Sequence, residues 1–170
     1  MWELQPQGRE MSVNEMHAYL LALGIGFVAG LRSMTGPAVV SWGAHLGRLN
    51  LRGSALAVFG TAGATGICTL LAATEFVVDL MPQAPNRTEP ASLLVRILTG
   101  GFSGACLCVS AGSSGVAGAV LGAMGGVIGG FAGFEARTRL VKEWKAPGAA
   151  VAIPEDLLAI GLACAIVFWG

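Results

Sequence analysis

The amino-acid sequence predicts an all-α fold, a polytopic transmembrane helix bundle of about five Gly/Ala-rich spans. The 170 residues have a mean hydropathy of +0.70, and only 12% of them are charged. The apolar residues form runs of about 17–25 residues, enough to cross roughly 30 Å of hydrocarbon. This length suits one compact bundle, so we expect a polar N-terminal segment over 1–17 and a single transmembrane domain over 18–170.

The first predicted span is broken near its end. Its apolar run covers 18–40, and the break falls at Arg32–Pro37, because proline removes a backbone donor and Gly36 before it weakens the helix further. Only 112–114 separates the third span from the fourth, which predicts a tight helical hairpin. The remaining spans cover 54–80, 92–111, 115–136 and 151–169.

Glycines in the fourth span are spaced to form two stripes along one helix. In water each glycine costs about 1 kcal/mol relative to alanine. In a bilayer the helix is enforced, because an unpaired backbone group in hydrocarbon costs several kcal/mol. We therefore expect the stripes to bring neighbouring helices to backbone contact. They consist of Gly118, Gly122, Gly126 and Gly130, and of Gly125, Gly129 and Gly133.

Composition excludes several classes of function. The formal net charge is zero, so we expect no nucleic-acid partner. Cys106 and Cys108 face away from each other on a helix and no zinc-type spacing exists, so we expect no metal and no cofactor. His17 and His45 are predicted on opposite sides of the membrane, and no Gly-x-Ser-x-Gly, His-Glu-x-x-His or phosphate-binding glycine loop is present. We therefore do not expect an enzyme.

Lysines and arginines predict the orientation. If five spans alternate, one side of the membrane collects seven of them and the other side three, and positive residues favour the cytoplasm. We therefore expect a cytoplasmic N-terminus and an external C-terminus, whereas a re-entrant first segment would reverse this. The larger group is Arg9, Arg87, Arg96, Arg137, Arg139, Lys142 and Lys145, and the smaller is Arg32, Arg48 and Arg52.

A short internal similarity relates 29–35 to 132–138, with three identities in seven residues. In the alternating topology these two helices run in opposite directions, as in the inverted repeats of many transporters. Chance similarity within a Gly/Ala-rich chain is the competing explanation.

Arg32 is the most suggestive single residue. It lies well inside the first apolar run, and a helix broken there frees backbone carbonyls and amides beside a guanidinium and the hydroxyls of Ser33 and Thr35. Broken helices of this kind build substrate or ion sites in transporters. The alternative is that Arg32 snorkels to the membrane interface and binds no ligand.

Acidic residues gather at the ends of later spans, at the predicted cytoplasmic interface. Glu75 and Asp79 stand four residues apart and share one helix face. Glu155 and Asp156 follow Pro154, at a helix N-terminus whose partial positive charge favours carboxylates. Two interpretations stay open: the acids cap helices and pair with arginines, or they line a polar vestibule for a cation, a proton or a cationic substrate. The other members of this candidate site are Arg87, Arg96 and Glu135.

Three motifs resemble those of a known family. They are GLRSMTGP at 30–37, the pattern Glu75…Asp79…Pro82…Pro85…Arg87-Thr88, and AIPEDLLAIG at 152–161. Together with the glycine-rich fourth span, they resemble a bacterial family of small multi-pass membrane proteins catalogued as domain of unknown function 4126. The resemblance implies a helical membrane fold, and it brings no established activity or catalytic residue.

We expect an integral membrane protein of transporter or channel-like type, of unknown solute, in a bacterial inner membrane. Arg32 and the broken helix would contact the permeant species, while the acidic residues gate it. The alternative is a non-catalytic subunit or scaffold, because the small-residue stripes are denser than one copy needs for its own packing. The expected partners are membrane lipid and either further copies of the chain or a larger membrane complex.

Overall fold

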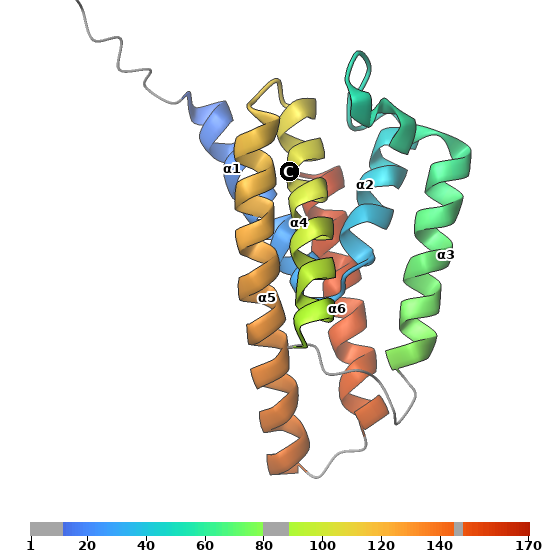
Figure 1. Ribbon diagram of the computed structural model, residues 1–170, viewed down its shortest axis with the longest axis vertical. Coiled ribbons are helices and arrows are strands. Elements are labelled where there is room, and N and C mark those ends of the chain that lie inside the picture. Colours follow the sequence, from blue (N-terminus) through green and yellow to red (C-terminus); the bar gives the residue numbers. More distant parts are fainter. Residues whose placement is uncertain (1–11, 80–88, 145–147) are drawn as a thin grey trace, which may run out of the picture.

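The computed structural model describes residues 12–79, 89–144 and 148–170, and it confirms the predicted all-α fold. Long helices stand side by side, and successive ones run in alternating directions (Figure 1). The described residues form seven helices: α1 (Val13–Leu31), α2 (Thr35–His45), the 3-10 helix η1 (Ala55–Gly60), α3 (Ala62–Asp79), α4 (Pro90–Ser110), α5 (Gly115–Trp144) and α6 (Gly148–Phe168).

Three of these helices are long and apolar enough to cross a membrane. They are α1, α4 and the Gly115–Leu140 part of α5, while α3 holds a shorter apolar stretch over Ala62–Val78. The chain is therefore a candidate multi-pass membrane protein. Within the described residues the structure supports three such spans, where the sequence predicted about five.

The first apolar segment is a hairpin of two helices, not one broken span. A methyl group on Gly36 would lie 3.2 Å from the Cβ atom of Ala29 and 3.6 Å from the carbonyl oxygen of Ile25, so α2 folds back along α1. The break is where the sequence placed it, but Pro37 lies in the first turn of α2, where its missing N–H leaves no hydrogen bond unmade. The alternation of five spans was therefore wrong at its first step.

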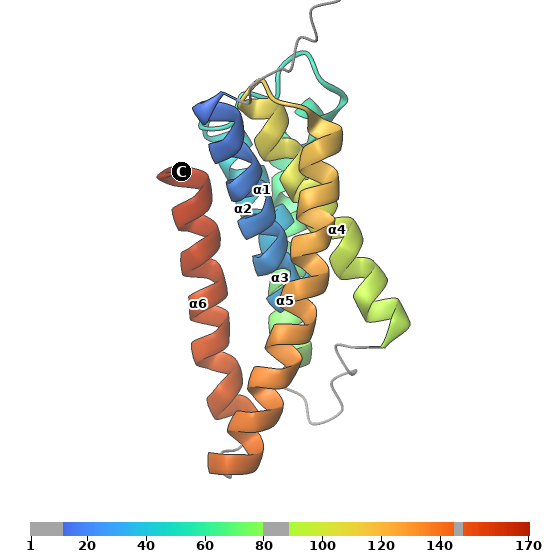
Figure 2. The same cartoon turned by 90° about the vertical axis from the view of Figure 1, so that its left-hand side faces the viewer.

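Three expectations built on that alternation are also wrong. Gly26 packs against Gly122 and Gly30 against Gly126, so α1 and α5 run in the same direction and form no inverted pair. The first turn of α1 and the last turn of α6 lie at the same end of the bundle (Figures 1 and 2). Because α2 returns to the end where α1 begins, His17 and His45 lie at the same end of the molecule as well.

The glycine stripes of α5 lie against two different helices. On the α4 side, a methyl group on Gly126 would lie 2.6 Å from the carbonyl oxygen of Arg96. On the α1 side, Gly129 meets the backbone of Phe27. The helices α1, α4 and α5 therefore touch through their backbones, as small residues allow in a bilayer.

Helix α3 is attached differently. It stands at the edge of the bundle and packs mainly against α2 and η1 (Figure 1). Leu70 is 69% exposed, although it lies in the middle of the helix. Polar contacts connect α3 to α2: the Trp42 indole donates to the Thr69 hydroxyl at 3.0 Å, and the Thr65 hydroxyl donates to the carbonyl of Ser41 at 3.4 Å.

The packing predicts opposite effects for the same substitution at two helical glycines. Gly126→Ala should destabilise the protein by about 1–3 kcal/mol, because the added methyl meets the α4 backbone. Gly66→Ala should stabilise it by up to about 1 kcal/mol, because nothing lies within 4 Å and alanine favours helix. Unfolding of the two variants in detergent micelles measures both effects, and a loss of stability at both positions would contradict this packing.

Candidate functional site

The α1–α2 break leaves backbone groups without helical partners inside the bundle. Helix α1 ends at Leu31 and α2 begins at Thr35, so only Arg32, Ser33 and Met34 connect them. The last carbonyls of one helix and the first amides of the next therefore need other partners. In hydrocarbon each unsatisfied group costs several kcal/mol, so the surrounding helices must supply those partners.

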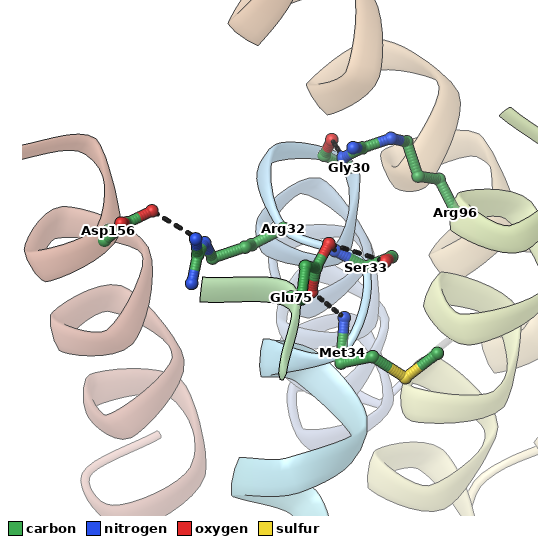
Figure 3. Close-up of polar contacts among 7 residues, drawn as sticks. All are labelled: Gly30, Arg32, Ser33, Met34, Glu75, Arg96 and Asp156. Atoms are coloured by element: carbon green, nitrogen blue, oxygen red, sulfur yellow. Dashed lines mark hydrogen bonds and ion pairs between the residues drawn. The ribbon is translucent and has the colours of Figure 1, made fainter. Parts of the chain in front are cut away.

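Glu75 of α3 supplies them at the start of α2 (Figure 3). Its carboxylate accepts from the N–H of Ser33 at 2.9 Å, from the Ser33 hydroxyl at 2.7 Å and from the N–H of Met34 at 2.8 Å. A negative charge at a helix N-terminus is favoured by the helix dipole. Hydrogen bonds to a charged group each contribute about 1.5–3 kcal/mol, so this is a strong junction between α3 and the hairpin.

Arg96 of α4 supplies a hydrogen-bond donor for the carbonyl end of α1. Its guanidinium donates to the carbonyl oxygen of Gly30 (Figure 3). Its Nε also lies 3.4 Å from the Ser92 hydroxyl. Arg96 is 5% exposed, so its positive charge lies within the bundle, at the negative end of a helix. The two ends of the break are thus capped by opposite charges from two different helices.

Arg32 itself forms an ion pair with a residue of α6. Its Nε atom lies 2.6 Å from Oδ1 of Asp156, and the two side chains are only 4% and 3% exposed (Figure 3). Its guanidinium carbon also lies 5.1 Å from the ring centroid of Phe76, within cation–π range. This buried ion pair joins the break to α6.

Four charged side chains therefore converge on one break. Arg32 and Arg96 balance Glu75 and Asp156, so the set carries no formal net charge. They come from the hairpin, α3, α4 and α6, while α5 presents glycine backbone beside Arg96. Each of the contacts described above joins two groups of the protein itself. A proton or ion can therefore bind to one of these charged groups only if the contact of that group breaks.

The structure brings together five of the predicted site residues and separates others. Thr35 is buried in the first turn of α2, and Glu155 is half-buried beside Asp156. Glu135 lies apart on α5, exposed, with its carboxylate 2.7 Å from Nε of Arg139. The Asp79 side chain and Arg87 fall outside the residues whose side chains the structure describes. The five that converge are Arg32, Ser33, Glu75, Arg96 and Asp156.

Sequence reasoning missed four participants. The carbonyl of Gly30 and the N–H of Met34 are backbone groups, which residue-type patterns do not mark, although any helix break must expose such groups. Phe76 looked like one more apolar residue of its span. Ser92 stands four residues before Arg96, and this i,i+4 spacing was the one available signal.

The buried ion pair predicts strong coupling between Arg32 and Asp156. Arg32→Met or Asp156→Leu alone should lower the free energy of unfolding by about 3–5 kcal/mol, because the remaining charge is buried without its partner. The double variant should lose clearly less than the sum. Arg139→Met, in the exposed pair with Glu135, serves as the control and should change stability by less than about 1 kcal/mol. Additive single effects in detergent unfolding would contradict the pairing.

Comparison with known proteins identifies the family and no activity. A family described as a domain of unknown function, DUF4126, matches residues 19–169, which include every residue of the break and its four charges. No curated protein and no solved structure matches the chain. The match confirms the resemblance of the three motifs and covers most of the sequence, and the protein therefore belongs to the DUF4126 family.

Proposed function

We propose that this protein is a small transporter or channel-like membrane protein, non-enzymatic, whose permeant species is handled at the α1–α2 break. The observation that supports the proposal most is the charged cluster on a re-entrant hairpin, with Arg32 and Asp156 almost fully buried. Ionisable residues inside membrane spans are costly and typically mark ion or substrate pathways. Discontinuous helices in transporters carry binding sites at such breaks.

Energetics favour a functional over a purely structural role for the cluster. Replacing a buried ion pair by apolar residues of similar size is often neutral or stabilising, so stability alone does not call for Arg32 and Asp156. The bundle already has backbone contacts among α1, α4 and α5 to hold it together.

Helix α3 is the element best suited to move. It exposes large apolar side chains and is joined to the hairpin by a few polar contacts, of which those of Glu75 are the strongest. Breaking the Glu75 contacts would release the amides of Ser33 and Met34 together. Glu75 is thus a gate residue in this proposal.

The hairpin also revises the proposed orientation. Arg48 and Arg52 lie in the loop at the end where α1 begins, whereas Arg137, Arg139 and Lys142 lie on the last turns of α5 at the other end. Because positive residues favour the cytoplasm, the end of α5 faces the cytoplasm and the start of α1 faces outward. The membrane, on the resemblance to a bacterial family, is the inner membrane.

This orientation predicts which introduced cysteines react from outside. Ala55 and Glu89 are both exposed, lie outside the candidate spans and are toward opposite ends of the bundle. A membrane-impermeant maleimide should label Ala55→Cys in intact cells and Glu89→Cys only after permeabilisation. The unmodified chain, whose four cysteines lie within the helices, gives the background. The reverse pattern would overturn the orientation.

Transport itself is tested by flux through liposomes that contain the purified protein. Across a panel of protons, alkali cations, halides and phosphate, we expect flux of at least one solute, and Glu75→Gln should raise it about tenfold. The reason is that glutamine lacks the charge that strengthens the contacts to Ser33 and Met34. Glu135→Gln, the same change at an exposed acid outside the cluster, is the control. If the unmodified protein and the Glu75→Gln variant are both folded and neither gives flux of any solute, transport is contradicted.

One observation favours the alternative, a non-catalytic subunit or scaffold of a larger membrane assembly. Added methyl groups on Gly63 and Gly66 of α3, and on Gly161 of α6, would meet nothing within 4 Å. Glycines of this kind fit a partner helix at close range, from a second copy or another protein. A folded protein that transports nothing and co-purifies with a stoichiometric partner would favour this function.

A further inference from the structure

A second polar feature lies at the other end of α2, away from the charged cluster. The end of α2, the loop over 46–54 and η1 line a half-open hollow of about 580 Å³, here called the loop pocket. Its volume falls within the range of about 300–1,000 Å³ that is usual for small-molecule sites. The polar side chains that line it are His45, Asn50, Arg52 and Thr61.

The loop that forms the pocket is held in place from several sides. Leu49 and Leu51 are buried in the core, and the N–H of Asn50 donates to the Ser110 hydroxyl of α4 at 2.9 Å. Gly47 has a positive φ of 73°, a conformation that glycine adopts at no steric cost. The pocket is therefore largely preformed, which lowers the entropic penalty of binding a ligand.

The charges of the pocket are one-sided. Arg52 lines it, and its lining contains no acidic side chain. The negative end of α2 is offset by the loop itself: the carbonyl of Gly43 accepts from the N–H of Arg48 at 2.8 Å and from that of Leu49 at 3.1 Å. Among the residues that the structure describes, no carboxylate forms an ion pair with Arg52.

His45 contributes a donor that depends on protonation. Its Nδ1 lies 3.0 Å from the carbonyl oxygen of Gly60, and because a carbonyl only accepts, Nδ1 carries the hydrogen. In the neutral ring Nε2 is then an acceptor, and in the protonated ring it is a second donor. The loop carries Arg48 and Arg52, and the first turns of α1 carry Glu15 and His17 at the same end of the bundle. The 3-10 helix η1, the first turn of α3 and the last turns of α4 and α6 carry no acidic or basic side chain.

We propose that the loop pocket binds a phosphate group, with Arg52 and protonated His45 as its donors. The guanidinium fork suits a phosphate oxyanion, and the pocket is larger than a lone phosphate ion needs, so the remainder of the ligand occupies it too. The pocket lies at one end of the helix bundle, a position that a soluble compound and a lipid headgroup can both reach. The phosphate belongs to a soluble compound or to a lipid headgroup. This inference stands apart from the proposed transport.

The donors are tested on the full chain in uncharged detergent, titrated with sulfate. Sulfate is a phosphate mimic whose charge does not change between pH 5.5 and 7.5. Arg52→Gln should weaken sulfate binding at pH 5.5 about tenfold or more. Arg48→Gln, the same loss of charge on the same loop but outside the pocket lining, should change it less than about twofold. Equal losses in the two variants, or no sulfate binding at all, would overturn the proposal.

The contribution of His45 and the source of the phosphate need two further measurements. Sulfate should bind about tenfold more tightly at pH 5.5 than at pH 7.5, and His45→Gln should abolish this difference; equal affinities in the unmodified chain would overturn the role of His45. Inorganic phosphate and phosphatidylglycerol are then compared at one pH. Arg52-dependent binding of phosphate without binding of the lipid identifies a soluble ligand, and Arg52-dependent binding of the lipid more tightly than phosphate identifies a headgroup. Binding of neither contradicts the site.

Discussion

The backbone of the α1–α2 break must find hydrogen-bond partners inside a bundle whose surroundings supply none. A helix that ends within hydrocarbon exposes carbonyls at one end and amides at the other. The protein meets this constraint with charge: Arg96 binds the carbonyl end and Glu75 the amide end. Each charge has the sign that the adjacent helix dipole favours. These two contacts join α3 and α4 to the hairpin at the break.

A second pair of charges, both buried, lies at the same break. Arg32 lies between the capped ends, and Asp156 of α6 balances it at 2.6 Å. The close approach of the helices around this site depends on the glycines of α5, since a side chain at Gly126 would displace the α4 backbone that carries Arg96. Packing and electrostatics are thus coupled here: bare backbone on one helix makes room for charge from another.

The molecule is asymmetric in how its helices are held. Backbone contacts bind α1, α4 and α5 tightly, whereas α3 relies on polar contacts at its edge. The charged cluster and the loop pocket lie toward opposite ends of the short helix α2. A displacement of α2 would therefore move residues of both sites. A tightly packed three-helix unit therefore stands beside a helix that is attached mainly through polar side-chain contacts.

The sequence by itself determined the class of structure and the place of the break. These features depend on residues that are close in the sequence: the apolar runs, the glycine spacing, and the effect of Gly36 and Pro37 on the helix. They can therefore be recognised before the fold is known. Arg32, Glu75 and Asp156 stood out for the same reason, since a charge in an apolar run is conspicuous wherever the chain goes.

Only the tertiary structure decided the direction of the chain after the break and the pairing of the charges. Three linking residues allow α2 either to continue across the membrane or to return along α1, and packing of Gly36 against Ala29 selects the return. Partners such as Ser33 and Glu75 are separated by more than forty positions, so no local pattern relates them. Glu135 carries the same charge as Glu75 but faces away from the break, because which face of a helix meets its neighbours is a property of the assembled bundle.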